Sequence, residues 1–414
     1  MSVTSTTTSE AHMALEDRFG AHNYHPLPVV LSKGEGVYVW DAEGKKYYDF
    51  LSAYSAVNQG HCHPKIISAL TTQAQTLTLT SRAFYNNKLG EYEQFMCDFF
   101  GFDKMLPMNT GAEAVETALK ICRKWAYEIK GIPENAAKII VCDGNFHGRT
   151  TTIISFSNDT NARKNFGPYT DGFISIPYDD IDALENALAG SGEIAGFLVE
   201  PIQGEAGVYV PADGYLEKAK SLCEKYNVLF IADEVQTGVA RTGKRLAVDH
   251  ENVQPDVLIL GKALSGGVYP VSAVLASDEI MNVIKPGQHG STFGGNPLAA
   301  AVAMAALNVV KEESLAENAQ ALGELFRERM ATYITTSSIA TLVRGKGLLN
   351  AVVINDSEDS DTAWNICLRL RDNGLLAKPT HGNIIRFAPP LVMNREQLLD
   401  CVSIICETLK EFEK

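Results

Sequence analysis

Residues 258–267, with the sequence LILGKALSGG, join an apolar run of strand type to a lysine and a glycine-rich step. The apolar run ends at Leu260, and Lys262 follows it closely. Strand ends form the edge at which open α/β sheets bind their ligands, so we predict that Lys262 lies at such an edge. A partly desolvated lysine loses its proton readily and forms an imine with an aldehyde. The alternative for Lys262 taken alone is a surface lysine that follows a buried strand.

A second apolar run, NVLFIADE at residues 227–234, ends in Asp233. A lysine and a carboxylate at two strand ends suit pyridoxal 5'-phosphate (PLP), because the lysine binds its aldehyde carbon and the carboxylate keeps its pyridine nitrogen protonated. The pyridinium would also neutralise Asp233, which is costly to bury without a cationic partner. The alternative for Asp233 is a helix N-cap, for which Thr237 and Gly238 are weak followers. The two runs therefore favour PLP as the cofactor.

The composition is that of a soluble globular protein with two or more domains, since 414 residues exceed one ordinary core. The formal net charge of −14 argues against nucleic acid and anionic membranes as partners, and no apolar run approaches membrane-spanning length. The eight cysteines show no CxxC spacing, which favours a reducing compartment. His61-Cys62-His63 invites a metal interpretation, but adjacent strand residues point to opposite faces, so no metal is expected.

The first twenty residues are rich in Ser and Thr and contain three acidic residues and one arginine, Arg18. A transit peptide is rich in arginine and poor in acids, so we predict a disordered tail at residues 1–20 of a cytoplasmic protein. A chain trimmed of a mitochondrial presequence would have the same appearance, and that alternative stays open.

Apolar strands alternate with helical patterns through the middle of the chain, which predicts an α/β fold with a mostly parallel sheet flanked by helices. The predicted strands are residues 138–142, 195–200, 228–233, 257–260 and 271–276. The predicted helices include residues 109–129, 215–225 and 297–312.

After about residue 313 the pattern changes to that of a smaller α+β domain, to which an N-terminal hairpin at residues 37–50 could add strands. Its predicted helices are residues 314–332, 361–373 and 395–412, and its predicted strands are residues 339–343, 348–354 and 384–387. The expected division is a tail at residues 1–20, an N-terminal segment at 21–55 that joins the small domain, a large PLP-binding domain at 56–312, and the small C-terminal domain at 313–414.

Several side chains near predicted strand ends suit a flat, phosphorylated ligand. Residues 109–112 open a helix with a small step, where backbone N–H groups and the helix dipole would bind a phosphate; the alternative is an ordinary N-cap by Thr110. Phe146 and Val235 could cover the two faces of the ring, although an aromatic residue at position 146 is more often part of the core. The guanidinium of Arg149 fits a carboxylate in a two-point contact.

Arg386 lies within IIRFAPP, where flanking apolar residues should draw it inward. A buried arginine needs a counter-charge. Glu205 follows a predicted strand at the same sheet edge and is a candidate for that partner.

The chain contains, in this order, the motifs NTGAEA, GNFHGRT, EPIQGEAGV, LFIADEVQTG, GKALSGG and STFGGNP. The class III, PLP-dependent aminotransferases of fold type I have these motifs in the same order, and the chain resembles that family. From about residue 20 it also resembles the ornithine δ-aminotransferases, through NYHPLPVVL, SAYSAVNQGHCHP, RAFYNN, VRGKGLLNA and LLAKPTHGNIIRFAPPLV. The resemblance implies a fold type I architecture and a ping-pong reaction, in which the δ-amino group of ornithine passes to 2-oxoglutarate and leaves glutamate 5-semialdehyde.

The resemblance also implies a role for each matching residue. Lys262 and Asp233 are the catalytic pair, and Lys262 moves the proton between substrate and cofactor. The implied cofactor contacts are Gly111, Ala112, Phe146, Asp233, Val235, Gln236 and Lys262, with Thr292 reaching the phosphate of a neighbouring subunit, so that a homodimer is the minimal active unit. The implied substrate residues are Tyr24, Tyr54, Arg149, Glu205 and Arg386, of which the last two form a switch between substrates.

Position 147 leaves the substrate open to alternatives. His147 stands where certain ornithine enzymes carry Trp and acetylornithine enzymes commonly carry His, so enzymes acting on acetylornithine or 4-aminobutyrate are the nearest alternatives. The bulky Tyr54 argues against a substrate with an acylated α-nitrogen. A non-catalytic binding protein of this fold is disfavoured, because Lys262, Asp233 and Gln236 are intact.

Overall fold

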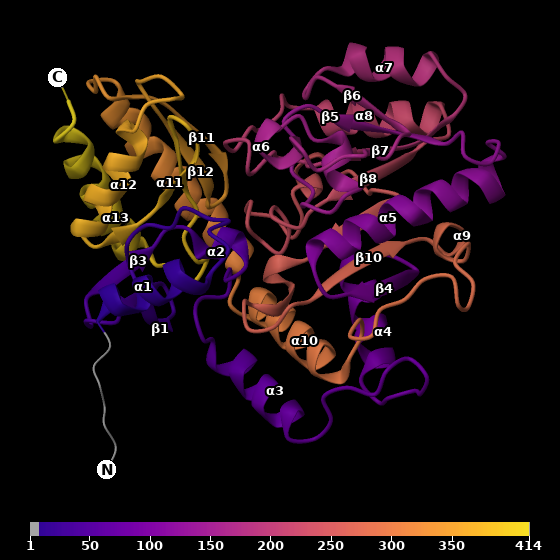
Figure 1. Cartoon of the computed structure of the whole chain (residues 1–414), viewed down its shortest axis with the longest axis horizontal. Helices are drawn as coiled ribbons and strands as arrows, with labels where there is room; N and C mark the ends of the chain where they lie inside the picture. Colours follow the sequence, from indigo (N-terminus) through magenta and orange to yellow (C-terminus); the bar gives the residue numbers. More distant parts are fainter. Residues whose placement is uncertain (1–7, 414) are drawn as a thin grey trace.

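The computed structural model describes residues 8–413 and has a seven-stranded sheet in the larger part of the molecule (Figure 1). The strand order is β4-β10-β9-β8-β7-β5-β6, and neighbours are parallel except at β10, which is antiparallel to both β4 and β9. The predicted α/β fold with a mostly parallel sheet is confirmed. Its strands are β4 (Lys104–Met108), β5 (Lys138–Cys142), β6 (Phe173–Ile176), β7 (Ile194–Val199), β8 (Leu229–Asp233), β9 (Val257–Leu260) and β10 (Ser272–Ala276).

The central strands are buried on both faces, as their uninterrupted apolar sequences require. Alternate residues of β8 point to opposite sides, so Phe230 and Ile231 belong to two different buried clusters. Helix α5 (Gly111–Trp125) packs in the cluster of Ile231, and helices α8 (Tyr215–Lys225) and α10 (Pro297–Glu312) pack in the cluster of Phe230. The other helices of this part are α3 (Pro64–Ala74), α4 (Leu89–Phe100), α6 (Thr160–Arg163), α7 (Ile181–Ala189) and α9 (Asp278–Met281).

The strands β4 and β6, at the two ends of this sheet, are not predicted by the sequence pattern. The sequence of β4, KMLPM, contains Pro107, which lacks an N–H donor and suits an edge strand. The sequence of β6, FISI, is short and exposes Ser175. Neither strand therefore has the continuous apolar run by which the central strands are recognised.

The C-terminal part contains a four-stranded antiparallel sheet in the order β11-β12-β15-β14. Its strands and helices alternate as predicted for an α+β unit, and the boundaries proposed at residues 55 and 312 stay predictions. The strands are β11 (Ala340–Lys346), β12 (Leu349–Ile354), β14 (Lys378–His381) and β15 (Ile384–Phe387), and the helices are α11 (Leu315–Ile334), α12 (Thr362–Asp372) and α13 (Arg395–Lys410).

The N-terminal hairpin forms a third sheet together with a strand from the C-terminal part. In Figure 1, β1 and β3 lie beside α12 and α13. Strands β1 (Leu31–Glu35), β2 (Tyr38–Asp41) and β3 (Lys46–Asp49) are antiparallel, and β3 pairs in parallel with β13 (Leu375–Leu376). A single turn, α2 (Ser52–Ser55), follows β3 directly.

The prediction of a disordered tail at residues 1–20 is wrong for its second half, and residues 1–7 lie outside the described part. Helix α1 (Ser9–Phe19) begins after Thr8, whose side chain accepts a hydrogen bond from the N–H of Ala11. Ser9 also donates from its N–H and hydroxyl to the carboxylate of Glu43, over 2.8 and 2.6 Å. The Ser- and Thr-rich composition therefore includes an N-cap. Within residues 8–413, no helix has the length and apolar character of a membrane span.

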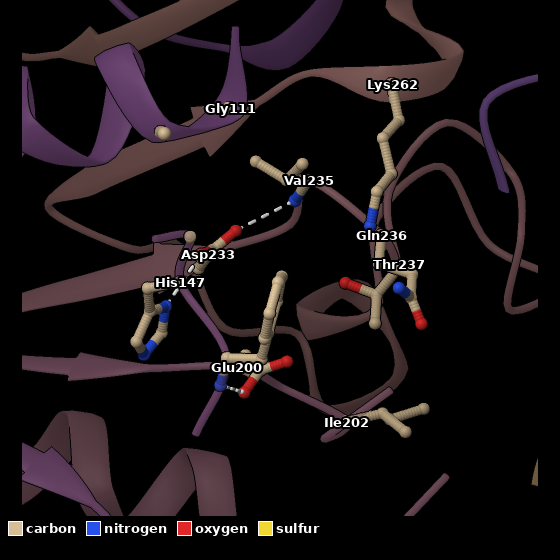
Figure 2. A pocket seen from close by; sticks show the side chains of 12 residues that line it. Gly111, His147, Glu200, Ile202, Asp233, Val235, Gln236, Thr237 and Lys262 are labelled. Carbon is tan, nitrogen blue, oxygen red and sulfur yellow. Dashed lines mark hydrogen bonds and ion pairs between the residues drawn. The ribbon is translucent and has the colours of Figure 1, made fainter. Parts of the chain in front are cut away.

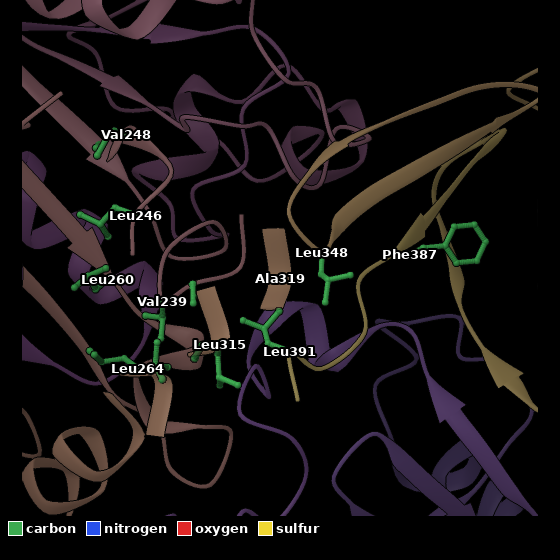
Figure 3. Packing of buried hydrophobic residues seen from close by; sticks show 14 of the residues in the cluster. Val239, Leu246, Val248, Leu260, Leu264, Leu315, Ala319, Leu348, Phe387 and Leu391 are labelled. Carbon is green, nitrogen blue, oxygen red and sulfur yellow. The ribbon is translucent and has the colours of Figure 1, made fainter. Parts of the chain in front are cut away.

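One cluster of buried apolar residues extends from the large sheet into the C-terminal part, and Figure 3 shows Leu260 and Leu348 within it. The fully buried Arg241 joins the same parts through hydrogen bonds, donating to the carbonyl oxygens of Leu348 and Pro389 over 2.9 and 2.7 Å. Burial lowers the pKa of Arg241 to about 9. The two sheets are therefore packed against a shared core.

Glu234 is buried directly after β8, and its burial makes the stability of the protein depend on pH. Its carboxylate accepts hydrogen bonds from the hydroxyl of Thr237 and, over 2.9 Å, from the N–H of Val248. Burial raises the pKa of Glu234 from 4.5 to about 7. Because the folded-state pKa is raised, its contribution to stability is present below pH 4.5 and is lost as the pH rises through 7.

We expect Glu234→Gln, which stays neutral, to be more stable than the wild type at pH 8 by about 3 kcal/mol, with a difference below about 1 kcal/mol at pH 5. Urea unfolding of both proteins at the two pH values measures this difference. A stability difference that does not change with pH would contradict the raised pKa of Glu234.

Candidate active site

A cavity of about 190 Å³ lies where the carboxyl ends of β7, β8 and β9 meet the start of α5 (Figure 2). This is the sheet edge predicted from residues 258–267. The cavity brings together most of the predicted cofactor residues, namely Gly111, Ala112, Phe146, Asp233, Val235, Gln236 and Lys262. It also contains residues that were not predicted as cofactor contacts, namely His147, Gly148, Glu200, Ile202 and Thr237.

Lys262 follows β9 and extends its side chain into the cavity toward Gln236 (Figure 2). Its backbone has a φ of 43°, in the left-handed region, which costs a non-glycine residue on the order of 1–3 kcal/mol. Burial lowers the pKa of Lys262 below its usual range, an effect that the charge of Glu205 opposes and that of Arg386 reinforces. The lowered pKa makes the amine of Lys262 easier to deprotonate, which a lysine needs in order to act as a nucleophile.

Asp233 is held from two sides at the end of β8. Its Oδ1 accepts a hydrogen bond from the N–H of Val235 over 3.0 Å, and its Oδ2 accepts one from Nδ1 of His147 over 2.7 Å. Burial alone would lower the pKa of His147, but the hydrogen bond and charge of Asp233 outweigh it and raise the pKa. His147 therefore lines the candidate cofactor cavity and contacts Asp233, whereas the sequence marked it only as a position that differs among related enzymes.

Glu200 is a second residue that sequence reasoning missed as part of the cofactor site. Its Oε2 accepts a hydrogen bond from the N–H of Phe146 over 2.9 Å, which fixes the backbone beneath that ring. Burial raises the pKa of Glu200 to about 7, while the charge of His147 acts to lower it. The signal in the sequence was its place immediately after the buried strand β7.

The start of α5 forms the expected anion-binding position. Thr110 caps the helix, since its hydroxyl oxygen accepts from the N–H of Glu113 over 3.2 Å, so the N-cap alternative for Thr110 is correct as well. At Gly111 a Cβ atom would lie only 2.9 Å from Cγ1 of Val235, so this position has no room for a side chain. The first N–H groups of the helix and its dipole attract a phosphate.

These residues fit PLP. Lys262, the buried carboxylate of Asp233 and the start of α5 all border one cavity, and Phe146 and Val235 line it as well. The carboxylate of Asp233 would pair with a pyridinium, and the amine of Lys262 would bind an aldehyde.

Glu205 and Arg386 form the ion pair that the sequence suggested. Nη1 of Arg386 lies 2.8 Å from Oε1 of Glu205 and 3.2 Å from Oε1 of Gln236, and Nε2 of Gln236 donates to Oε1 of Glu205 over 2.9 Å. Burial acts to raise the pKa of Glu205, but the positive charges of Arg386 and Lys262 outweigh it and lower the pKa to about 2. The carboxylate of Glu205 is therefore charged throughout the physiological range.

The remaining predicted residues do not line the cofactor cavity of their own chain. The ring of Tyr54 lies next to Arg386, with 5.2 Å from the guanidinium carbon to the ring centroid. Tyr24 is 69% exposed and borders a neighbouring cavity that Tyr54 also lines. Arg149 is exposed, with its guanidinium 5.7 Å from the ring centroid of Phe146, and Thr292 is exposed too.

Several known proteins are similar to this chain over nearly their whole length. "Ornithine aminotransferase, mitochondrial" of Drosophila melanogaster is 63% identical over 97% of this chain and 92% of the fly protein. The structure of the ornithine aminotransferase of Toxoplasma gondii, which has PLP at partial occupancy in its active site, is 50% identical with a TM-score of 0.96, over 98% of this chain and 95% of that one. A structure named acetylornithine aminotransferase from Elizabethkingia anophelis is 66% identical with a TM-score of 0.91, over 98% of this chain and 100% of that one.

The prediction of a cytoplasmic protein is wrong, because the similar fly protein is named mitochondrial. The acidic, Ser- and Thr-rich start of the chain carried that prediction. Composition is weak evidence for a compartment, because targeting depends on short signals rather than on the residues that fold.

The family assignment rests on the whole length of the chain. The sequence profile described as aminotransferase class-III matches residues 19–409, which include every element that lines the cavity. The relatives above agree with this match in sequence and in fold. The chain belongs to the aminotransferase class-III family.

Proposed function

We propose that the protein transfers the δ-amino group of ornithine to 2-oxoglutarate, which yields glutamate 5-semialdehyde and glutamate in two half-reactions. The observation that carries the proposal is the ion pair of the buried Arg386 with the partly buried Glu205, at 2.8 Å. The names of the fly and Toxoplasma relatives support the same substrate.

The cofactor residues divide the work between them. PLP supplies an aldehyde carbon that binds the amino group and a ring that accepts electrons when its nitrogen is protonated. Asp233 would hold the proton at that nitrogen. The hydrogen bond from Nδ1 of His147 to Oδ2 of Asp233, of 2.7 Å, fixes the orientation of the carboxylate. Nζ of Lys262 has the lowered pKa that a base needs to take a proton from the substrate carbon and return it.

The ion pair explains how one pocket accepts two differently shaped substrates. Ornithine reacts at its δ-amino group, whereas glutamate reacts at its α-amino group, which lies next to a carboxylate. Glu205 occupies Arg386 in the first case, so the α-carboxylate of ornithine is not drawn there. In the second case the carboxylate of glutamate replaces Glu205, which exchanges one charge-assisted pair for another.

Acetylornithine is the second candidate substrate, because the Elizabethkingia structure carries that name and His147 is common in such enzymes. Tyr54 argues against it, since its ring stands next to Arg386 where an acylated α-nitrogen would need room. The third candidate substrate is an ω-amino acid such as 4-aminobutyrate, which differs from ornithine in having no α-amino group.

A panel of single-turnover half-reactions tests the proposed substrate. Purified enzyme with PLP is mixed with ornithine, N-acetylornithine or 4-aminobutyrate, and the loss of the bound cofactor's absorbance is followed. We expect ornithine to react with a second-order rate constant at least about tenfold above the others, a preference of about 1.4 kcal/mol. A faster reaction with N-acetylornithine would assign the enzyme to that substrate instead.

A homodimer with shared active sites is part of the proposal. Thr292 is exposed and does not line the cavity of its own chain, and the adjacent Phe293 is 50% exposed. Phe84 and Tyr85 are also exposed, at 73% and 104%. Exposed aromatic residues of this kind are typical of surfaces that a partner covers.

Mixing two inactive variants tests whether Thr292 serves the neighbouring subunit. Lys262→Ala removes the amine, and Thr292→Glu places a negative charge against the phosphate. If the sites are shared, a hybrid dimer has one site with both native residues, so unfolding and refolding the mixture should restore up to about a quarter of the wild-type activity. If Thr292 acts within its own chain, every hybrid site lacks one residue and no activity returns.

A further inference from the structure

The turn that carries Tyr54 has an unusual backbone. Residues Ser52, Ala53, Tyr54 and Ser55 have φ values of 50°, 45°, 60° and 71°, so four consecutive non-glycine residues are left-handed. L-residues adopt this conformation singly rather than in runs, because it brings Cβ too close to the following carbonyl oxygen. The hydroxyl groups of Ser52 and Ser55 are also buried without a hydrogen-bond partner in the described part of the chain. Such strain persists only where surrounding contacts enforce it.

Asp49 and His61 enforce the start of this turn. Oδ1 of Asp49 accepts hydrogen bonds from the N–H groups of Leu51 and Ser52 over 2.8 and 2.9 Å. Its Oδ2 accepts one from Nε2 of His61 over 2.7 Å. His61 is fixed in turn by two backbone hydrogen bonds with Gly36, of 2.8 and 3.0 Å. We call Asp49 and His61 the turn clamp.

The turn clamp is connected to the strand that carries Arg386. Between Asp49 and the turn, the carbonyl oxygen of Phe50 accepts from the N–H of Ala388 over 2.8 Å, two residues beyond Arg386. The ring of Tyr54 then lies 5.2 Å from the guanidinium carbon of Arg386. The clamp residues also border the cavity that contains Tyr24 and Tyr54. The position of Tyr54 relative to Arg386 therefore depends on the backbone that Asp49 holds.

We infer that Asp49 and His61 are positioning residues, which fix Tyr54 beside Arg386 and thereby set the preference for ornithine over an amine that lacks the α-amino group. This inference rests on the proposed function. Neither residue reaches the cofactor cavity, and both act through the shape of the turn. Their loss should affect recognition of ornithine much more than the chemistry at Lys262.

The test compares ornithine with 5-aminopentanoate, which has the same chain and reacting amino group but no α-amino group. We expect Asp49→Ala to raise KM for ornithine about tenfold, to leave kcat within about threefold, and to reduce the preference for ornithine over 5-aminopentanoate about tenfold. The glutamate half-reaction and the amount of bound PLP should change less than about threefold. Asp49→Asn keeps the oxygen acceptor, so we expect it to restore both KM and the preference to within about threefold of the wild type.

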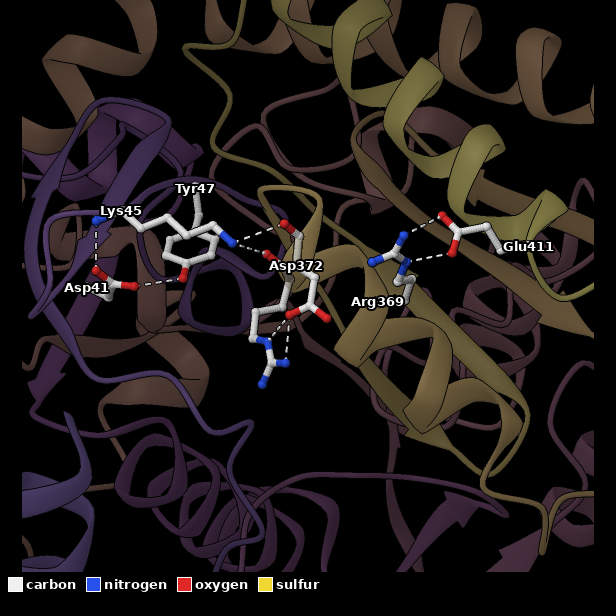
Figure 4. Close-up of polar contacts among 7 residues, drawn as sticks. Asp41, Lys45, Tyr47, Arg369, Asp372 and Glu411 are labelled. Carbon is white, nitrogen blue, oxygen red and sulfur yellow. Dashed lines mark hydrogen bonds and ion pairs between the residues drawn. The ribbon is translucent and has the colours of Figure 1, made fainter.

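Asp41 provides a matched control in the same sheet, as Figure 4 shows for its contacts with Lys45 and Tyr47. Asp41 and Asp49 are 8% and 7% exposed, and each accepts two backbone N–H groups at Oδ1 and one side chain at Oδ2. Asp41 holds the hairpin turn between β2 and β3, and not the turn of Tyr54. Asp41→Ala should therefore leave the substrate preference unchanged even if it lowers stability.

Equal losses of preference in Asp41→Ala and Asp49→Ala would overturn the inference and assign the effect to general loosening of the sheet. An Asp49→Asn variant as impaired as Asp49→Ala would overturn it as well. If Asp49→Ala does not fold, His61→Ala, which removes the donor to Oδ2 of Asp49 and leaves the two backbone contacts of Oδ1, carries the same comparison. If the wild type does not prefer ornithine over 5-aminopentanoate, the proposed function is refuted. If the wild type has this preference and the Asp49 and His61 variants keep it, only the role of the turn clamp is refuted.

Discussion

Replacing Lys262 with alanine should reduce transamination at least about 10³-fold, which corresponds to about 4 kcal/mol of activation free energy. The variant loses the amine that binds the aldehyde and moves the proton. It should retain PLP, because Asp233, the start of α5 and the residues beside the ring position are unchanged. Single-turnover reaction with ornithine measures the activity, and absorbance after desalting measures the bound cofactor.

The exposed Lys244 supplies the control for that experiment, since Lys244→Ala removes a lysine outside the cavity and should leave both quantities unchanged. Turnover of Lys262→Ala within about tenfold of the wild type would mean that another group moves the proton. Loss of PLP together with activity would show that the covalent bond, rather than the surrounding residues, retains the cofactor.

Replacing Glu205 with alanine should change which amino group of ornithine reacts. Without its partner at 2.8 Å, Arg386 is a buried, uncompensated charge, a situation that costs roughly 3–5 kcal/mol. The α-carboxylate of ornithine would then bind Arg386 and present the α-amino group to the cofactor. We expect 5-amino-2-oxopentanoate alongside glutamate 5-semialdehyde, and a glutamate half-reaction that is comparatively intact. Product analysis after one turnover measures the ratio.

The double variant Glu205→Ala/Arg386→Ala separates the two charges in this experiment. With Arg386 gone, the α-carboxylate is no longer attracted to that position, so reaction at the δ-amino group should return while the glutamate half-reaction is lost. If Glu205→Ala alone still removes only the δ-amino group at the wild-type rate, the selection between amino groups does not depend on this pair.

The lining of the candidate cofactor cavity was largely predictable, because its residues follow sequence patterns that fix their place in the fold. Asp233 and Lys262 come directly after buried apolar strands, and parallel strands bring their carboxyl ends to one edge. The pairing of Glu205 with Arg386 was suggested only by the need of a buried arginine for a counter-charge. Their contact joins residues 181 positions apart, and no local pattern determines it.

Other features could not be predicted because long-range contacts override local preference. The turn of residues 52–55, SAYS, contains no glycine and gives no indication of left-handed backbone. The contact of His147 with Asp233 depends on how the segment after β5 folds over the end of β8. Helix α1 was missed because a Ser- and Thr-rich stretch resembles a tail until one of its residues is recognised as a cap.

The buried cluster that joins the two sheets restricts how substrates enter. Swinging the C-terminal part away as a rigid body would hydrate residues such as Leu264 and Leu348, at about 25 cal/mol for each Å² of apolar surface exposed. It would also break the hydrogen bonds that Arg241 donates to Leu348 and Pro389. Opening the two parts widely at a hinge would therefore have a high cost in free energy. Substrate exchange is expected to proceed instead through local motions of side chains and loops at the cavity mouth, while the framework stays closed throughout the catalytic cycle.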